Sequence, residues 1–277
     1  MTPFSRAKYL VPNAFTLGAA LCGFVSVSIS TQATTTDEFY RAAALIALAV
    51  FLDGFDGRVA RMLNAQSKLG AQLDSLSDFL TFGVAPGLLI YSWGLRPLGA
   101  IGLFVAFVFA ASAMIRLARF NVEAETHGGA SRYFTGLPSP MGGLALALIV
   151  GVNAGVLDRE GAGSEALGEL AAFVVVVGLL MVSTVPFRTF KDLRPTWRVR
   201  ILLATFVGLQ ILVGIRVDFM VALAMGMVAY IVFHVPSGVI GATRVVKVRA
   251  HRDGRAAALV SDDDDSGEFD APEFDED

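Results

Sequence analysis

The sequence predicts an all-α fold, a polytopic transmembrane helical bundle of about eight spans. Hydrophobic residues make up 55% of the 277-residue chain and charged residues only 17%, whereas soluble domains are about one quarter charged. The apolar residues stand in long runs rather than in an alternating or amphipathic pattern, which favours a bilayer as the solvent. The single cysteine, Cys22, excludes an internal disulfide and a cysteine-cluster metal site.

Eight apolar runs are candidate membrane spans, because a span needs roughly 20 mostly apolar residues. Aspartates interrupt the second and third runs. The last two are separated only by Arg216-Val217-Asp218, which predicts a tight helical hairpin. The runs cover about residues 11–31, 39–60, 69–93, 98–119, 138–157, 168–187, 199–215 and 219–240.

The basic residues predict the orientation of the chain in the membrane. With the N-terminus in the cytoplasm, 18 of the 22 Lys and Arg residues fall at cytoplasmic ends and loops, and four fall on the opposite side. This asymmetry follows the positive-inside rule. We therefore expect an integral membrane protein whose N- and C-termini are both cytoplasmic.

Composition divides the chain into a transmembrane domain at residues 1–243, a basic juxtamembrane segment at 244–260 and an acidic tail at 261–277. The tail holds ten of the 25 Asp and Glu residues and no base, which is typical of a disordered segment. The basic segment can bind anionic lipid headgroups, since each base contributes about 1 kcal/mol near such a surface.

The second and third runs each place two aspartates on one helix face. On the second run, the aspartates share their face with a glycine and an alanine. On the third, a glycine and two aspartates repeat every four residues. Two facing helices would bring the carboxylates together, with small residues leaving room between them. The residues are Asp53, Asp56, Gly57, Ala60, Gly70, Asp74 and Asp78.

Such a cluster needs a compensating cation, because a single carboxylate at the centre of a span costs about 2.5–3.5 kcal/mol on insertion scales. Oxygen ligands suit magnesium, calcium or manganese, and magnesium often shares its shell with substrate phosphates. The three histidines are scattered and form no competing site. The pattern therefore predicts a metal–phosphate site in a cytoplasm-facing active-site cavity. The alternative is a set of helix-end charges paired with Arg58, Arg61 and Lys68.

The fixed spacing of these residues resembles the motif of the CDP-alcohol phosphatidyltransferase family. It reads Asp53-x-x-Asp56-Gly57-x-x-Ala60-Arg61, then eight residues, then Gly70-x-x-x-Asp74-x-x-x-Asp78. One branch, the membrane-embedded phosphatidylserine synthases, is similar in further stretches. These are residues 10–16, 78–86, 116–121 and 134–140.

The resemblance implies transfer of a phosphatidyl group from CDP-diacylglycerol to an alcohol, which in this branch is L-serine, with release of CMP. It implies two divalent ions, Mg²⁺ or Mn²⁺, among the four aspartates, and it makes Asp78 the base that activates the alcohol. It also implies a homodimer in the lipid bilayer. It implies no binding of nucleic acid beyond the CDP moiety of the substrate.

The resemblance further implies residues that bind CDP-diacylglycerol. Arg61 suits a phosphate oxygen, because its guanidinium forms paired hydrogen bonds. The glycines leave space for a nucleotide against the backbone. The set is Asn13, Thr16, Gly57, Ala60, Arg61, Ser67 and Gly70.

Four residues are candidates for binding the acceptor. Arg116 and Arg119 offer partners to a carboxylate, and Asn121 offers a hydrogen bond. Ser139 stands between two prolines at the expected start of a helix, where backbone donors favour anions. The alternative is positive-inside anchoring for the arginines and a simple helix start at Ser139.

Other functions stay open at this point. Glycerol 3-phosphate, inositol or inositol phosphate as the acceptor would need further bases, which Arg116, Arg119 and Arg132 could supply. A cation transporter would need acids at several depths of the membrane, whereas these acids cluster near one face. A catalytically silent scaffold would not explain the complete motif.

Overall fold

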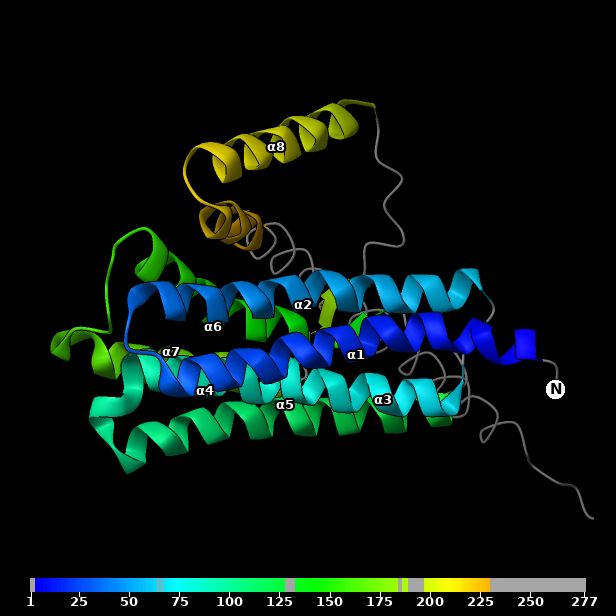
Figure 1. Cartoon of the computed structure of the whole chain (residues 1–277), viewed down its shortest axis with the longest axis horizontal. Coiled ribbons are helices and arrows are strands. Elements are labelled where there is room, and N and C mark those ends of the chain that lie inside the picture. Colours follow the sequence, from blue (N-terminus) through cyan, green and yellow to red (C-terminus); the bar gives the residue numbers. More distant parts are fainter. Residues whose placement is uncertain are drawn as a thin grey trace, which may run out of the picture.

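Long helices lying side by side make up most of the computed structural model (Figure 1), which describes residues 3–63, 65, 67–127, 133–183, 186–188 and 197–229. The helices are α1 (Pro3–Gln32), α2 (Thr36–Met62), α3 (Lys68–Asp78), α4 (Ala85–Ile90), α5 (Ala100–His127), α6 (Ser139–Gly155), α7 (Leu167–Val182) and α8 (Trp197–Arg216). A short 3-10 turn, η4 (Ser164–Ala166), precedes α7. The predicted segments at 244–260 and 261–277 lie outside the described residues.

The helical and membrane character that the sequence predicts is confirmed, but eight spans are not. Within the described ranges, four segments are long and apolar enough to cross a membrane: Val11–Gln32, Lys68–Leu98, Ala100–Glu123 and Ser164–Val182. Three other apolar helices are shorter: Ser139–Gly155, Thr205–Arg216 and Phe219–Ala229. The predicted run at 39–60 is helical as part of α2, but its charged residues lower its hydropathy. Residues 230–240 of the last run lie outside the description.

One continuous helical segment runs from Lys68 to Leu98 and departs from α-helical winding in two places. After α3 it widens into the π-helical turn η1 (Phe79–Val84), and after α4 into η2 (Tyr91–Leu95) and the 3-10 turn η3 (Arg96–Leu98). The Ala85 N–H donates to the Leu80 carbonyl, one residue further back than in an α-helix. Pro86 has no N–H to continue an α-helical ladder, which favours the wider turn. Asp78 lies directly before it.

The N-terminus of α2 is fixed by a reciprocal capping box. The Thr35 side chain accepts from the Glu38 N–H, and the Glu38 carboxylate accepts from the Thr34 and Thr35 N–H groups at 2.8 and 3.1 Å. These donors hold the pKa of the Glu38 carboxyl below its ordinary value. The cap stabilises one end of the helix whose other end carries Asp53 and Asp56.

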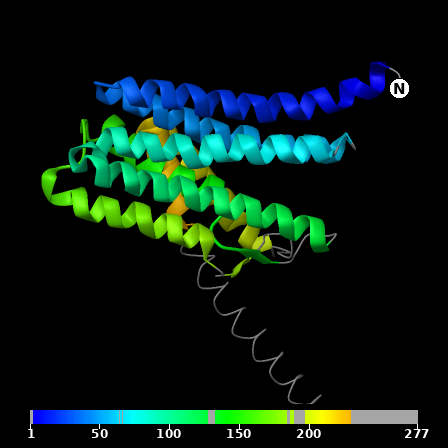
Figure 2. The same cartoon turned by 90° about the horizontal axis from the view of Figure 1, so that it is seen from below.

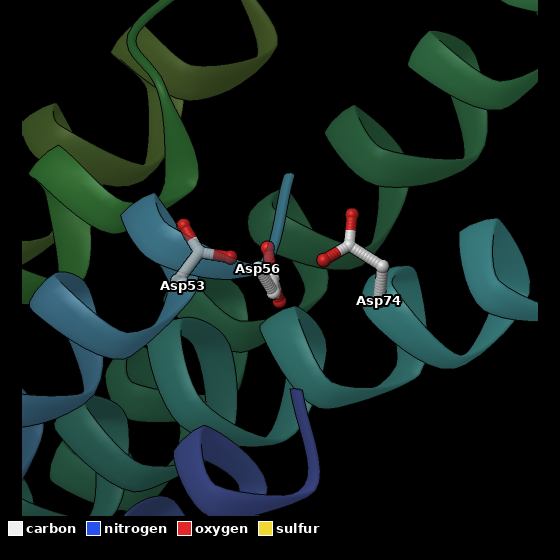
Figure 3. A group of neighbouring side chains, drawn as sticks. All are labelled: Asp53, Asp56 and Asp74. Carbon is white, nitrogen blue, oxygen red and sulfur yellow. The ribbon is translucent and has the colours of Figure 1, made fainter. Parts of the chain in front are cut away.

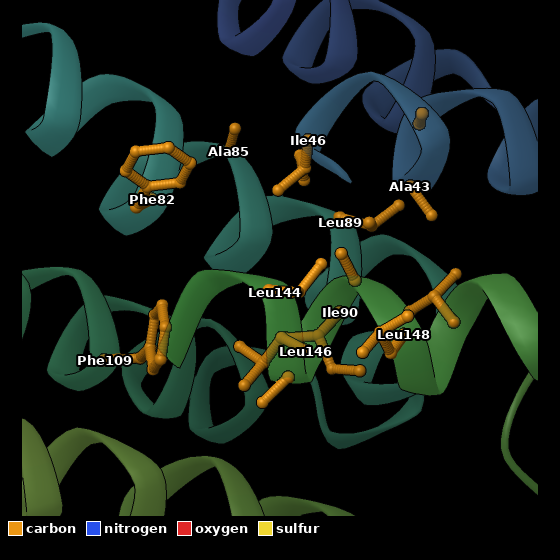
Figure 4. Close-up of a cluster of buried hydrophobic side chains, with 14 of the residues drawn as sticks. Ala43, Ile46, Phe82, Ala85, Leu89, Ile90, Phe109, Leu144, Leu146 and Leu148 are labelled. Atoms are coloured by element: carbon orange, nitrogen blue, oxygen red, sulfur yellow. The ribbon is translucent and has the colours of Figure 1, made fainter. Parts of the chain in front are cut away.

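The apolar core lies where α2, α4, α5 and α6 meet (Figure 4). Alanines on α2 are fully buried, which lets α1 and α6 pack closely against it. Larger side chains fill the space between the helices, and α7 covers the outer side of α5 (Figure 2). Fully buried members of this core include Ile46, Phe82, Leu89, Ile90, Phe109 and Leu146.

A small antiparallel sheet is the one departure from the all-α prediction in the part of the chain that the structure describes. Strand β1 (Tyr133–Thr135) pairs with β2 (Pro186–Arg188), with Phe134 opposite Phe187. Three-residue strands carry too few positions for a period-2 pattern to appear in the sequence. The pairing joins the loop before α6 to the segment after α7, and the Leu137 N–H donates to the Leu180 carbonyl at 3.0 Å.

The predicted hairpin after α8 is confirmed. The Val217 and Asp218 N–H groups both donate to the Val213 carbonyl, and a second helical segment, Phe219–Ala229, follows. Figure 1 shows α8 set apart from the other helices. The hairpin is attached to α2 by a hydrogen bond from the Tyr40 hydroxyl to Asp218 at 2.9 Å. Buried Met220 packs against Gly151 of α6.

Two adjacent glycines of α6 allow a test of the packing around η1. A Cβ on Gly143 would stand 3.0 Å from the Phe82 Cα and carbonyl oxygen, whereas a Cβ on Gly142 would meet only the flexible Met181 side chain. We predict that Gly143→Ala lowers the free energy of unfolding by about 1–3 kcal/mol through overpacking. Gly142→Ala should cost much less. Thermal unfolding of both variants in detergent measures this, and equal losses would contradict the contact.

Candidate active site

Three aspartates from two helices form an acidic cluster. Asp53 and Asp56 lie near the C-terminal end of α2, and Asp74 lies in the middle of α3. Their carboxylates point toward one another (Figure 3), and one oxygen from each lies within 4.8 Å of the others. Asp56 is buried, while Asp53 and Asp74 are half-buried. The helical spacing in the sequence predicts this gathering correctly.

The fourth aspartate of the motif extends the cluster. Asp78 lies one turn beyond Asp74, and its carboxyl is within hydrogen-bonding reach of that of Asp53. It also interacts electrostatically with Asp74 and with the guanidinium of Arg116. Asp78 therefore adjoins the acidic cluster and also interacts with a basic group.

One hydroxyl group of α1 contacts the acids, and one of α3 links the acid-bearing helix to α5. The Thr16 hydroxyl donates to Asp56 Oδ2 at 2.9 Å. Ser75 and Asn121 exchange hydrogen bonds at 3.0 and 3.1 Å, which joins α3 to α5 beside Asp74. Sequence reasoning missed Ser75 and Ser77, because a serine in an apolar run carries no signal until its partner is known.

Several residues predicted to bind CDP-diacylglycerol gather at the start of α3. The Ser67 hydroxyl caps this helix by accepting from the Gly70 N–H at 3.0 Å. A Cβ on Gly70 would stand 3.1 Å from the Ser67 Oγ and 3.5 Å from the Asn13 Oδ1. These three residues, from two helices, are therefore neighbours.

The remaining predicted nucleotide-side residues lie on the last turns of α2. Apart from its chain neighbours and the backbone of its own helix, no described atom comes within 4 Å of a Cβ built on the exposed Gly57, so the surface beside it is open. Arg61 is exposed and Ala60 is half-buried. The Thr16 side chain faces Asp56 rather than this open surface.

Half-buried Arg116, which interacts with Asp78, is paired with a buried serine. The Arg116 Nη1 donates to the Ser139 Oγ at 2.9 Å, and Ser139 is completely buried. Within the described residues, the buried Arg116 Nε has no hydrogen-bond partner. Desolvated donors without a partner are costly. The site therefore has an unused donor close to Asp78.

The two other candidates for acceptor binding have protein partners. Arg119 forms an ion pair with Glu123 at 2.9 Å and donates to the Val182 carbonyl at 3.4 Å, at the C-terminal end of α7. Asn121 is bonded to Ser75. The structure thus brings Arg116 and Ser139 together, but it directs Arg119 and Asn121 to neighbouring helices.

The donor set of the acidic cluster fits a hard divalent cation. Three carboxylate oxygens at this separation are the ligands that Mg²⁺ and Mn²⁺ prefer, whereas zinc prefers nitrogen and sulfur. Without a cation the like charges would repel one another in poorly solvated surroundings.

Comparisons with known proteins agree with the site. The sequence model of one family, described as CDP-alcohol phosphatidyltransferase, matches residues 9–185, which contain every candidate site residue. The chain is 36% identical over 201 residues to a CDP-diacylglycerol–serine O-phosphatidyltransferase of Helicobacter pylori, covering 73% of this chain and 81% of that protein.

Two further relatives carry the same name. The Bacillus subtilis protein is 33% identical over 181 residues, covering 65% of this chain and 91% of its own length. The Saccharomyces cerevisiae protein is 38% identical over 138 residues, covering 47% of this chain and 48% of its own. The chain therefore belongs to the CDP-alcohol phosphatidyltransferase family and is a transferase. Enzymes of this family in general depend on divalent metal ions.

The acidic cluster predicts stabilisation by divalent cations. Mn²⁺ or Mg²⁺ at 100 times its dissociation constant should raise the unfolding free energy by about 2.7 kcal/mol, because it binds only the folded state. Thermal unfolding with and without the cation measures this. Asp74→Asn should reduce the shift. Asp158→Asn is the matched control, because Asp158 accepts from Thr36 at the opposite end of α2. An unchanged shift in Asp74→Asn would contradict the site.

Proposed function

We propose that the protein transfers the phosphatidyl group of CDP-diacylglycerol to L-serine, producing phosphatidylserine and CMP. The observation that carries this proposal is that Asp78 adjoins the acidic cluster and also interacts electrostatically with Arg116, which donates to the buried Ser139. The names of the relatives support serine as the acceptor.

Asp53, Asp56 and Asp74 would hold Mg²⁺ or Mn²⁺, with two ions in the full site and Asp78 at its edge. The bound metal supplies neutralisation of charge on the phosphoryl oxygens. The role of the chain is to hold the carboxylates of two helices around a common centre. It would also keep the carboxylate of Asp78 beside the acceptor.

Asp78 is the proposed general base. Serine carries a neutral hydroxyl, which is a weak nucleophile until a base removes its proton. The hydroxyl oxygen forms a bond to the β-phosphorus of CDP-diacylglycerol, which carries the diacylglycerol. The bond between that phosphorus and the oxygen that joins it to CMP breaks. The proton passes to the Asp78 carboxylate, and CMP leaves with the bonding electron pair.

The nucleotide would lie along the open surface beside Gly57. Arg61, exposed on the same end of α2, can reach a phosphate oxygen. Asn13, Ser67 and Gly70, which are neighbours at the start of α3, would contact the same substrate. The proposed CDP-diacylglycerol site also includes Ala60, while Thr16 contributes through Asp56.

Arg116 would bind the carboxylate of serine, with Ser139 orienting the guanidinium. Its unpartnered Nε and its bonded Nη1 lie in surroundings where a charge-assisted hydrogen bond is strong. Arg119 and Asn121 stay predictions for this subsite. Their observed contacts suit the positioning of α5 against α7 and α3.

The geometry favours serine over the other candidate functions. A single half-buried guanidinium suits a carboxylate, whereas glycerol 3-phosphate or inositol phosphate would need further bases beside it. Arg132, a candidate for such a base, lies outside the described residues. A cation transporter would need acids along its path. Asp53, Asp56, Asp74 and Asp78 instead lie together in one cluster.

The proposal includes the membrane setting. We infer a protein in the bilayer with both termini and the site on the cytoplasmic side, since the basic residues are concentrated there. We also propose that it acts as a homodimer.

An acceptor screen tests the proposed reaction. Purified protein in detergent receives CDP-diacylglycerol, Mn²⁺ or Mg²⁺, and one acceptor at a time: serine, glycerol 3-phosphate, inositol, inositol phosphate or choline. We expect CMP release and phosphatidylserine, identified by mass, with serine alone. Turnover with a phosphorylated acceptor would overturn the serine assignment. No CMP with any acceptor would favour transport.

Replacement of Arg116 tests the acceptor subsite. Arg116→Ala should raise the KM for serine about tenfold or more, because a hydrogen bond to a charged group contributes about 1.5–3 kcal/mol. The KM for CDP-diacylglycerol should change much less. Arg96→Ala is the control, since Arg96 donates to the Thr31 carbonyl, which lies near the end of α1 and far along that helix from Thr16. Equal changes in both KM values would assign Arg116 a structural role.

A further inference from the structure

We propose that Thr16 is a positioning residue that holds the two halves of the acidic cluster together from α1. This inference deepens the proposed function and rests on it, because it assumes that the cluster binds a divalent cation. The family resemblance implies that Thr16 binds CDP-diacylglycerol. The contacts of the residue assign it to the carboxylates.

The side chain of Thr16 contacts the α2 half of the cluster. Thr16 and Asp56 are 5% and 6% exposed, and the hydroxyl donates to Asp56 Oδ2 at 2.9 Å. The same hydroxyl lies 3.2 Å from the Pro12 carbonyl. A hydroxyl has one proton, and a charged acceptor binds it more strongly than a neutral one. The bond to Asp56 therefore dominates and fixes the rotation of that carboxylate.

The backbone of Thr16 contacts the α3 half. The Ser77 hydroxyl donates to the Thr16 carbonyl at 3.0 Å, and Ser77 is also buried. Ser77 lies between Asp74 and Asp78 in the sequence, so this bond fixes the turn that carries both. Figure 1 shows α1 lying between α2 and α3, and it packs against both. One residue thus connects the two acid-bearing helices.

Such a connection matters because the carboxylates repel each other when the cation is absent. Without the Thr16 hydroxyl, Asp56 is free to rotate away from Asp53 and Asp74, and binding of the cation must then order it again. Partners that orient metal-binding side chains in this way typically change metal affinity about 10–100-fold. A nucleotide contact at Thr16 would instead change the KM for CDP-diacylglycerol.

The chain contains a matched control. Thr81, one turn beyond Ser77, donates its hydroxyl to the Ala19 carbonyl at 3.2 Å. This bond also joins α1 to the same long helical segment and is also buried, but it reaches no carboxylate. Thr81→Val therefore removes a buried hydrogen bond between α1 and the same helical segment, and it leaves the cluster intact.

The experiment is Mn²⁺ titration calorimetry on the full chain in detergent, combined with thermal unfolding without metal. We expect Thr16→Val to weaken Mn²⁺ binding about 10–100-fold, and Thr16→Ser, which keeps the hydroxyl, to stay within about threefold of wild type. Thr81→Val should bind Mn²⁺ like wild type. At saturating Mn²⁺, the KM for CDP-diacylglycerol of Thr16→Val should be nearly unchanged.

Two results would overturn the inference. One is wild-type Mn²⁺ affinity in Thr16→Val, and the other is an equal loss in Thr81→Val, which would reflect helix packing alone. Should Thr16→Val not fold, Ser77→Ala keeps the Thr16 hydroxyl and is expected to weaken Mn²⁺ binding severalfold; wild-type affinity there would contradict the connection to α3. If the wild-type chain binds no Mn²⁺, the proposed metal site itself is wrong, which is a distinguishable outcome.

Discussion

Repulsion between carboxylates in poorly solvated surroundings is the constraint on which the rest of the structure depends. Asp53, Asp56 and Asp74 bring their oxygens within 4.8 Å of one another, and Asp78 adjoins them. Water would screen such charges, but a helical bundle excludes most of it. The surrounding groups reduce this repulsion: a hydroxyl donates to Asp56, and a guanidinium faces Asp78. A hard cation bound by the three carboxylates would complete the neutralisation.

The same constraint explains why the neighbouring helices carry small and hydroxyl-bearing residues. Two acid-bearing helices can hold a fixed separation only if a third element connects them, and α1 does this with hydrogen bonds in both directions through Thr16. Close packing elsewhere, such as Gly143 against the Phe82 backbone, leaves little freedom for the turn after Asp78. The positions of the carboxylates and the packing of the helices therefore depend on each other, because the same hydrogen bonds determine both.

Helical periodicity is local, and for that reason the sequence predicts the acidic cluster and the hairpin after α8 well. Spacings of three and four residues decide which side chains share a face whatever the surroundings. Contacts between helices depend on their relative rotation, which no local pattern encodes. Three hydrogen bonds between helices could therefore not be predicted: those of Thr16 with Asp56, of Ser75 with Asn121, and of Arg119 with the Val182 carbonyl. The Arg116–Ser139 pair was predicted as two members of one subsite, but not as a direct contact.

The π-helical turn η1 has a consequence for which changes of sequence length the chain can accept. Residues before it place aspartates at the polar site, and residues after it, such as Leu89 and Ile90, fill the apolar core. Each residue advances an α-helix by about 100°, so an insertion or deletion between Phe79 and Val84 would turn one of these faces away from its partners. We therefore expect natural variation in this segment to occur by exchange of side chains at constant length, whereas the loops that join separate helices are free to lengthen or shorten.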